Sequence, residues 1–236
     1  MPRRDTAAWS CTNILIGHDC EVTGVAFSPN GRRLATVSAD MSVRLWNTYD
    51  GTPHGEPMSG HRGPVWGVAF SPTGRTLASA SVDTTVRLWA PETATALPVL
   101  SLEHDGYVVA VAFTLHGRAL VTGGGDTLVR VWDLTNGLSL HSVMTGHTGP
   151  INDLAVSPRG WIASSGADGD LRLWHVGDRE PADVHLAEHS SSMACVAFSP
   201  DGRTLAAGAD DGTVHVWSTA TRRPVREPWT AHDSPV

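Results

Sequence analysis

The sequence contains no lysine, and all seventeen of its strongly basic residues are arginines spread along 236 positions. Without lysine the chain has no Schiff-base amine, no phosphate-loop lysine and no Ser-x-x-Lys nucleophile pair. The formal net charge is −7, whereas binding to a nucleic-acid backbone needs clustered cations. These features exclude several enzyme classes and predict that the chain has no nucleic-acid partner.

Cysteines are few, and long apolar runs are missing. The three cysteines, Cys11, Cys20 and Cys195, show no metal-ligand spacing, and their odd number does not suit a disulfide framework. The N-terminal residues lack the apolar core of a signal peptide, and no stretch approaches the ~18 apolar residues of a membrane helix. We therefore expect a soluble, cytoplasmic chain that has no membrane partner.

The dominant feature of the sequence is a pattern that recurs every 42 or 43 residues. It begins at the histidines His18, His61, His104, His147, His189 and His232. Each of the first five is followed 27 or 28 residues later by a tryptophan, namely Trp46, Trp89, Trp132, Trp174 and Trp217. Between them lie the strings VAFSPNG, VAFSPTG, VAFTLHG, LAVSPRG and VAFSPDG. Such regular self-similarity is the signature of a repeat architecture.

Each repeat has the pattern of four short strands. A β-branched and aromatic run ends at Ser-Pro-x-Gly, where proline fixes φ and glycine accepts a positive φ. Two further strands follow, as in TLASAS and TVRLW, and a weaker fourth precedes the next histidine. Without any helical period, this pattern describes a propeller blade. We predict an all-β fold, a β-propeller of five four-stranded antiparallel blades, at residues 18–60, 61–103, 104–146, 147–188 and 189–231.

These residues carry a resemblance to a known family. The Gly-His pair, the SPxG turn, the Asp six residues before the tryptophan and the strand-ending tryptophan resemble the WD-repeat β-propellers. Strings such as SPDGRTLA are similar to bacterial-type WD repeats, although the name-giving dipeptide is complete only at Trp132 and Asp133. The resemblance covers five full repeats and implies a non-enzymatic scaffold or sensor that docks a protein or peptide.

The resemblance also implies a role for the recurring polar residues. In WD repeats a His, a Ser or Thr, an Asp and the Trp form a hydrogen-bonded tetrad within each blade. The corresponding residues here are His18, Thr36, Asp40 and Trp46; His61, Ser79, Asp83 and Trp89; His104, Thr122, Asp126 and Trp132; His147, Ser164, Asp168 and Trp174; and His189, Asp211 and Trp217. The fifth repeat has Ala207 in place of the hydroxyl residue, so its tetrad should be incomplete.

Two catalytic interpretations compete with this structural one. The His, Ser or Thr and Asp residues also have the composition of a nucleophile triad, but a triad is needed once, beside an oxyanion site, and this set recurs in four of the five repeats. The string HLAEH, from His185 to His189, matches a zinc-protease motif that works only on a helix. Here it falls on a predicted strand and loop. We therefore predict no catalytic residues, no metal ligands and no cofactor.

The positions that differ between repeats predict where a partner binds. In WD-repeat propellers the partner-facing end of the ring is lined by residues three and five after the histidine and by the residue before the turn Asp. Carried over, these are Glu21, Thr23, Ala39, Pro64, Trp66, Val82, Tyr107, Val109, Gly125, Pro150, Asn152, Ala167, Ser192, Ala194 and Asp210. Trp66 and Tyr107 have the composition of an interface hot spot. The alternative is that Trp66 packs against a neighbouring blade.

Two other functions stay open at this point. The chain could be a fragment of a larger WD-repeat regulatory protein whose effector domain is absent, or, less favoured, have an enzyme or small-ligand site in its central channel. WD-repeat propellers usually close with seven blades. Here residues 1–17 have the pattern of an N-terminal outer strand, and residues 232–236 start a sixth repeat. We favour an incomplete ring or open arc that self-associates through open blade edges.

Overall fold

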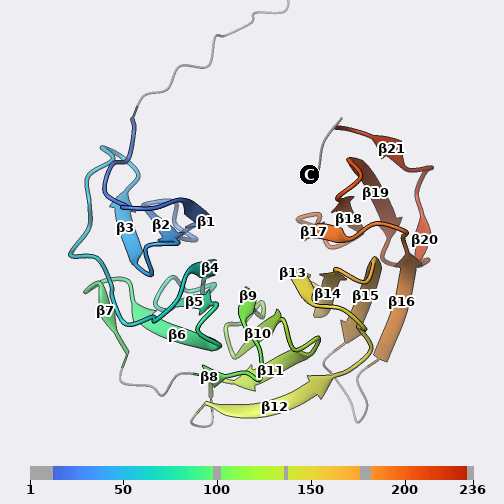
Figure 1. Ribbon diagram of the computed structural model, residues 1–236, viewed down its shortest axis with the longest axis horizontal. Helices are drawn as coiled ribbons and strands as arrows, with labels where there is room; N and C mark the ends of the chain where they lie inside the picture. Colours follow the sequence, from blue (N-terminus) through green and yellow to red (C-terminus); the bar gives the residue numbers. More distant parts are fainter. Residues whose placement is uncertain (1–12, 98–101, 136–137, 176–181, 233–236) are drawn as a thin grey trace, which may run out of the picture.

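The computed structural model describes residues 13–97, 102–135, 138–175 and 182–232. Within these residues every regular element is a β-strand, and no helix long and apolar enough to cross a membrane is present. Five antiparallel sheets stand around a central space (Figure 1). The prediction of an all-β fold with blades of the propeller type is confirmed.

Each blade is built from an inner strand, two middle strands and an outer segment. The inner strands are β1 (Val22–Phe27), β4 (Val65–Phe70), β9 (Val108–Phe113), β13 (Ile151–Val156) and β17 (Met193–Phe198). The second strands are β2 (Arg33–Ser38), β5 (Leu77–Ser81), β10 (Ala119–Gly124), β14 (Trp161–Gly166) and β18 (Thr204–Ala209). The third strands are β3 (Val43–Asn47), β6 (Thr85–Ala90), β11 (Val129–Asp133), β15 (Asp170–His175) and β19 (Thr213–Ser218).

The outer segment varies from blade to blade. Its strands are β7 (Thr95–Ala96), β8 (Leu102–Glu103), β12 (Ser139–Met144), β16 (Ala182–Glu188), β20 (Arg223–Pro224) and β21 (Trp229–Thr230). The third and fourth blades have one continuous outer strand, whereas the second and fifth have two short ones that pair with opposite ends of β6 and of β19.

The outer segment of the first blade pairs least. It is reduced to two isolated bridges, Val43 to Met58 and Trp46 to Pro53. Prolines at 53 and 57 lack the N–H that a continuous ladder needs. The sequence predicts an outer strand over residues 1–17. Residues 13–17 belong to no strand, and residues 1–12 lie outside the described residues.

The turns between inner and second strands follow the prediction from Ser-Pro-x-Gly. In the first two blades the glycine N–H donates to the serine carbonyl over 2.8 Å, from Gly31 to Ser28 and from Gly74 to Ser71. The glycines at this position, Gly31, Gly74, Gly117, Gly160 and Gly202, have φ between 64° and 84°. A positive φ is strained for other residues, which accounts for the repeated glycine.

The apolar core lies between neighbouring blades. One cluster joins Ala78 and Leu88 of the second blade to Val111 and Phe113 of the third, and the other junctions are built in the same way. Small side chains on the second strand, such as the fully buried Ala78, let the next inner strand approach. A single repeat therefore cannot bury its own apolar faces and needs a neighbour on each side.

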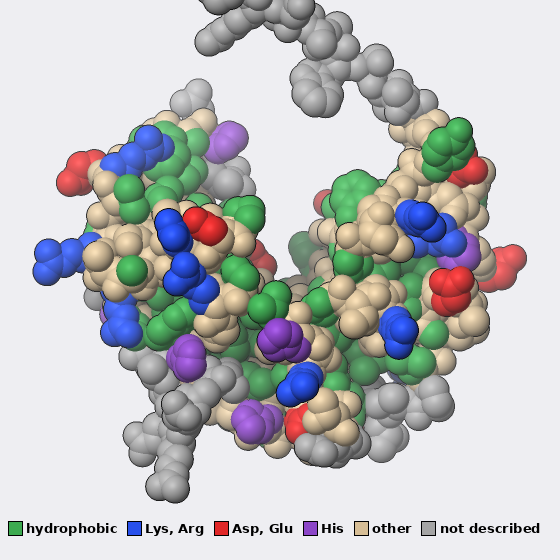
Figure 2. Space-filling view, turned by 180° about the vertical axis from the view of Figure 1, so that it is seen from behind, with side chains coloured by type: hydrophobic (Ala, Val, Ile, Leu, Met, Phe, Trp, Pro, Cys, Tyr) green, Lys and Arg blue, Asp and Glu red, His purple; other side chains and the backbone are tan. Residues whose placement is uncertain are grey.

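The five blades form an open arc. The inner strands contact one another in the order β1, β4, β9, β13, β17, and an opening separates the first blade from the fifth (Figure 1). The view from behind shows the same opening and apolar side chains gathered around the central space (Figure 2). The described residues therefore have the open arrangement that the repeat count favoured.

Candidate partner-binding cavity and the blade tetrads

The second blade shows how the repeated polar residues interact. The indole Nε1 of Trp89 donates to Oγ of Ser79 over 2.8 Å, and this Oγ lies 2.7 Å from Nε2 of His61. Nδ1 of His61 is 2.9 Å from Oδ2 of Asp83. Because the Asp83 carboxylate can only accept, Nδ1 of His61 carries the proton and donates it to Asp83. In a neutral imidazole Nε2 is then the acceptor, so the Ser79 hydroxyl donates to His61 while it accepts the indole N–H. The four side chains connect the loop between blades to both middle strands.

The same geometry recurs in three other blades. The indole-to-hydroxyl distance is 2.8 Å each time, for Trp46–Thr36, Trp132–Thr122 and Trp174–Ser164. The corresponding distances from the hydroxyl to His Nε2 are 2.7, 2.9 and 2.7 Å. Ser79, Thr122 and Ser164 are completely buried, so no substrate reaches these hydroxyls. This burial favours the structural role over a nucleophile triad.

The environment of the tetrads fixes their charge. Burial lowers the pKa of the His61 and His147 side chains, and burial together with the Arg130 charge lowers that of His104 to about 4. Burial opposes ionisation of Asp83, but hydrogen bonds from neighbours such as Thr85 outweigh it and lower the Asp83 pKa to about 2. These histidines are therefore neutral and Asp83 is charged near neutral pH.

The tetrad of the fifth blade is incomplete, as Ala207 predicts. Nε2 of His189 lies 3.6 Å from Oδ2 of Asp211, beyond hydrogen-bond length. The Trp217 ring instead stacks on His215, with ring centroids 5.5 Å apart and planes 7° from parallel. Without the bridging hydroxyl, no hydrogen bond connects His189 to the Trp217 indole among the described residues.

The third blade departs from the pattern in a way that the sequence analysis missed. Nη1 of Arg130 hydrogen-bonds to Asp126 and lies 2.8 Å from Nδ1 of His104, while the His104–Asp126 distance stretches to 3.3 Å. Leu128 takes the place of the hydroxyl residue that bonds the Asp in the first, second and fifth blades. Its apolar side chain leaves the Asp126 carboxylate open to Arg130.

A second substitution explains why Arg130 turns toward the tetrad. In the first, second and fourth blades a glycine before the histidine makes room for the arginine; a Cβ at Gly17 or Gly60 would lie 2.8 Å from Nη1 of Arg44 or Arg87. In the third repeat this glycine is replaced by Glu103. The replaced glycine and the missing hydroxyl together were the signals available in the sequence.

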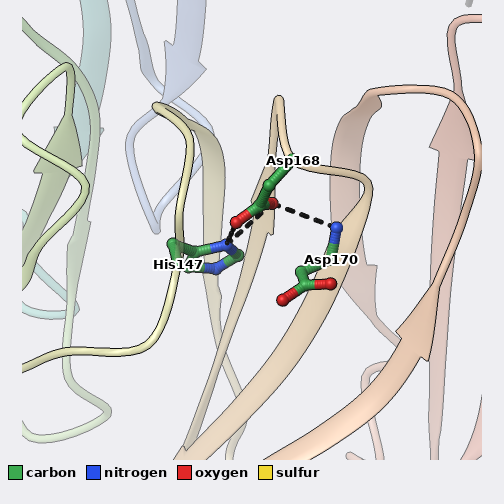
Figure 3. A group of neighbouring side chains, drawn as sticks. All are labelled: His147, Asp168 and Asp170. Carbon is green, nitrogen blue, oxygen red and sulfur yellow. Dashed lines mark hydrogen bonds and ion pairs between the residues drawn. The ribbon is translucent and has the colours of Figure 1, made fainter.

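One cluster in the fourth blade has the residue types of a metal site. His147, Asp168 and Asp170 present ligand atoms within 4.8 Å of one another (Figure 3). These atoms are already engaged: His147 bonds Asp168 over 3.0 Å, and Asp170 pairs with His185 at 2.9 Å and with Arg172 at 3.0 Å. The His147–Asp168 hydrogen bond and the contacts of Asp170 with Arg172 and His185 account for the cluster without a metal ion.

The zinc-protease string does not form a metal site in this geometry either. His185 lies in β16, so the helix that the motif requires is absent from this segment. Its Nε2 is directed to Asp170 in the neighbouring strand β15. An extended strand rises about 3.3 Å per residue, so residues four apart lie roughly 13 Å from one another, too far to share one metal ion.

The inner strands share a β-bulge at the same position. Register shifts occur between Val22 and Gly24 in the first blade and at the equivalent point of the other four. The residues passed over are Thr23, Trp66, Val109, Asn152 and Ala194. A bulge re-aims a side chain out of the ladder. These are the residues five positions after each histidine that the sequence places on the partner-facing end.

Side chains at these and neighbouring positions line a cavity of about 590 Å³. Its lining residues are Trp66, Val82, Tyr107, Val109, Asn152, Ser192, Ala194 and Asp210. All eight belong to the fifteen positions assigned to the partner-facing end. Trp66 is 48% exposed and Tyr107 is 40% exposed, so Trp66 is not packed away against a neighbouring blade. We call this site the inner cavity.

The other seven of the fifteen predicted positions do not line the inner cavity: Glu21, Thr23, Ala39, Pro64, Gly125, Pro150 and Ala167. Glu21 and Pro64 accept backbone hydrogen bonds through their carbonyls, from Ala39 and Val82. The Thr23 hydroxyl is bonded to the carbonyls of Val37 and Val65, so it ties the first blade to the second.

A partly buried carboxylate between the fourth and fifth blades was also missed. Oδ2 of Asp153 accepts the N–H of Val196 over 2.9 Å, and burial raises the pKa of this carboxyl. Nearby, the Asn152 amide donates to Ser192 Oγ and to the Met193 carbonyl, each over 3.0 Å. The signal in the sequence was a charged residue where other repeats have small or apolar ones.

The repeat pattern, the blades and the tetrads agree with a comparison to known families. The profile of the family described as WD domain, G-beta repeat, matches residues 9–47, 52–90, 97–133, 138–175 and 183–218. Together these segments cover most of the chain. The protein belongs to the WD-repeat family. Its five matched WD repeats correspond one by one to the five blades.

Curated relatives of this WD-repeat protein match over part of their length. Periodic tryptophan protein 2 of Arabidopsis thaliana is 35% identical over 81 residues, which are 34% of this chain and 9% of that protein. Small ribosomal subunit protein RACK1z of the same plant is 33% identical over 89 residues, 37% of this chain and 26% of that protein. Polycomb protein EED of Chaetomium thermophilum is 33% identical over 86 residues, 34% and 15% respectively. The chain spans about a quarter or less of these relatives.

Proposed function

We propose that this WD-repeat protein is a non-enzymatic interaction scaffold or sensor that binds a protein or peptide in the inner cavity. The observation that carries the proposal is the exposure of Trp66 and Tyr107 on one wall of that cavity. Half-exposed aromatic rings offer large apolar area at low entropic cost, and such residues dominate interface hot spots.

The two walls of the inner cavity differ in chemistry. Trp66, Val82, Tyr107 and Val109 form an apolar wall, and Asn152, Ser192 and Asp210 form a polar one. Asp210 is the only charged residue in the lining. This arrangement suits a partner segment that places an apolar side chain on Trp66 and Tyr107 and a basic group beside Asp210.

The lining of the inner cavity supports binding better than catalysis. Tyr107 and Asp210 are the only titratable side chains among the eight lining residues. An enzyme site needs a nucleophile with its base, or an acid and base pair, within reach of one another. The alternative of an enzyme or small-ligand site in the central channel therefore has less support.

The remaining expectations stay proposals. The acidic net charge supports a protein without nucleic-acid partners. The three cysteines without a disulfide pattern and the short apolar runs support a cytoplasmic protein without a membrane partner. The sparsely bridged outer edge of β3 supports self-association through blade edges, which light scattering on a sizing column tests. The small share of each relative that this chain covers supports its being part of a larger regulatory protein.

A peptide selection tests the proposed function. A displayed random peptide library is panned against the chain, and enriched peptides are tested against the Trp66→Ala, Tyr107→Ala double variant. The matched control is Tyr49→Ala, because Tyr49 is 97% exposed and does not line the cavity. We expect binding to the parent chain and the control and loss in the double variant. Equal binding to all three would contradict the proposal.

A further inference from the structure

A second pocket lies at the junction of the first and second blades, at the opposite end of the inner strands from the inner cavity. The inner cavity gathers residues near the starts of the inner strands, such as Trp66 in β4, whereas this pocket is built by the turns that follow β1 and β4. Its volume is about 460 Å³. Its polar lining includes Asn30, Arg32, Arg33, Thr73, Arg75 and Glu92. We call this site the arginine pocket.

The three arginines of this pocket are not neutralised by ion pairs. In the part of the chain that the structure describes, the arginines that form ion pairs are Arg130, Arg172 and Arg203. Arg33 is partly buried, and its Nη1 donates to the side-chain oxygen of Asn47 over 2.5 Å. This hydrogen bond orients the guanidinium group without cancelling its charge.

Two nearby carboxylates leave most of this positive charge unbalanced. Glu92 is exposed, and it is the one carboxylate among the described residues that line the pocket. Asp50 is exposed and lies outside the lining; hydrogen bonds from Thr52 lower the pKa of its carboxyl, and the Arg33 charge adds a smaller effect. Three guanidinium groups against one carboxylate give the lining an excess of two positive charges.

Asn30 adds a neutral donor to the same lining. Its side-chain oxygen accepts the Ser28 hydroxyl over 2.8 Å and the backbone N–H of Arg32 over 3.0 Å. Because the amide oxygen is used within the turn, the Nδ2 group is the end of this side chain that can donate to a ligand. The lining is therefore rich in N–H donors, which favours an anion.

The corresponding pocket between the third and fourth blades has a different lining. Its volume is about 470 Å³, and its apolar wall is formed by Leu115, Val156 and Ile162. It has two arginines, and Nε of Arg159 is engaged by the carbonyl of Asp201 over 3.0 Å. At the position of Arg33 the second, third and fifth repeats have Thr76, Ala119 and Thr204. The third arginine is therefore a feature of the first junction and not a general product of the repeat.

A single phosphoryl group suits this lining better than other anions. A guanidinium group offers paired N–H donors to two phosphate oxygens, and a phosphorylated side chain carries about −1.5 to −2 charges at neutral pH, which matches the excess of two. Phe70 and Pro91 add apolar surface for the residue that carries the phosphate. A nucleic-acid backbone needs several phosphate contacts along a track, whereas these arginines gather at one junction.

We propose that the arginine pocket binds a phosphoserine or phosphothreonine side chain of a partner polypeptide. Arg32, Arg33 and Arg75 pair with the phosphate oxygens, and the adjoining part of the partner packs against Phe70. The affinity for this partner then depends on its phosphorylation. The two pockets share no lining residue, so the proposal does not depend on the function assigned to the inner cavity.

Two peptide libraries test the proposal on the full chain. Both are degenerate around a fixed central position, which is phosphoserine or phosphothreonine in one library and serine or threonine in the other. We expect enrichment from the phosphorylated library, and a selected peptide should bind at least about tenfold more tightly with its phosphate than without it. No enrichment, or equal affinity of the two forms, would overturn the proposal.

Matched variants locate the bound phosphate. Arg32→Gln with Arg75→Gln removes two exposed charges, so the melting temperature should stay near that of the parent while the Kd of the phosphopeptide rises at least about tenfold. The control Arg203→Gln changes the arginine at the same repeat position of the fifth blade, which does not line the pocket, and should leave Kd within about twofold. An unchanged Kd in the double variant, or an equal rise in the control, would contradict the assignment.

Inorganic phosphate and the cavity variant separate the remaining sources of binding. Inorganic phosphate should displace the selected peptide only at concentrations at least about tenfold above the Kd of that peptide, because it lacks the contacts with Phe70. Equally tight binding of inorganic phosphate would make the free ion the ligand and overturn the proposal. The Trp66→Ala, Tyr107→Ala double variant should bind the phosphopeptide as the parent does. Loss of binding there would place the peptide in the inner cavity and would also overturn it.

Discussion

In the second blade, Oγ of Ser79 lies 2.8 Å from the indole Nε1 of Trp89, and both residues are buried. The same hydroxyl serves His61 at 2.7 Å, so one small side chain satisfies two buried polar groups. Ser79→Ala leaves both without a partner and should lower the free energy of unfolding by about 2–3 kcal/mol. Chemical denaturation measures the change. The exposed Ser59→Ala should stay within about 0.5 kcal/mol of the parent, and an equally small effect of Ser79→Ala would contradict the tetrad's role.

The buried histidines make stability depend on pH. Burial and the Arg130 charge lower the pKa of His104 from its ordinary value of 6.5 to about 4 in the native state, and burial also lowers the pKa of His61 and of His147. The unfolded chain therefore binds more protons below pH ~6.5, and stability falls as pH falls. His104 alone should cost about 1 kcal/mol between pH 7.5 and 5.5. Thermal melts in this range should show the loss, also in a control carrying His116→Gln in an exposed turn. A melting temperature that does not change with pH in this range would contradict neutral histidines in the tetrads.

Arg130 sets the third tetrad apart from the others. Its charge is second to burial in lowering the pKa of His104, and its hydrogen bond lowers the pKa of Asp126. Arg130→Leu should therefore raise the His104 pKa, which burial still holds below its ordinary value. An NMR titration of the His104 ring measures the shift. Arg118→Leu, at an exposed position, should leave it unchanged; a His104 titration insensitive to Arg130→Leu would contradict the contact.

Asp210 supplies the charge of the inner cavity. If the bound segment carries a basic group, Asp210→Asn should weaken binding about threefold and flatten its dependence on salt. The control is Asp19→Asn, an exposed carboxylate that does not line the cavity. Titrations of a selected peptide at low and high salt measure both effects. The same salt dependence in the parent and in Asp210→Asn would show that the polar wall takes no part in recognition.

The repeat period was enough to predict most of the fold and the members of the tetrads. Strands, turns and blade order follow from local residue patterns, and each tetrad is contained in one repeat, so fixed spacing was enough to identify its members. The absence of a hydroxyl at Ala207 was visible for the same reason. At these positions the residues that interact lie within one repeat of the sequence.

What the sequence could not supply arises between repeats. The family resemblance places Trp66, Asn152 and Asp210 on one end of the ring, but whether they line one cavity depends on the curvature of the arc and on the bulges of the inner strands. The contact of Arg130 with His104 was missed because it depends on two substitutions, Leu128 and Glu103. These two residues are far apart in the sequence and act together only in the folded blade.

The central claim is that a polypeptide partner binds through Trp66 and Tyr107 in the inner cavity. Calorimetric titration of a selected peptide into the parent chain, the Trp66→Ala, Tyr107→Ala double variant and the Tyr49→Ala control tests it most directly. We predict that the double variant raises Kd by at least about 30-fold while its melting temperature stays near that of the parent, since both rings are partly exposed. A Kd unchanged by the double substitution would place the partner elsewhere and contradict the claim.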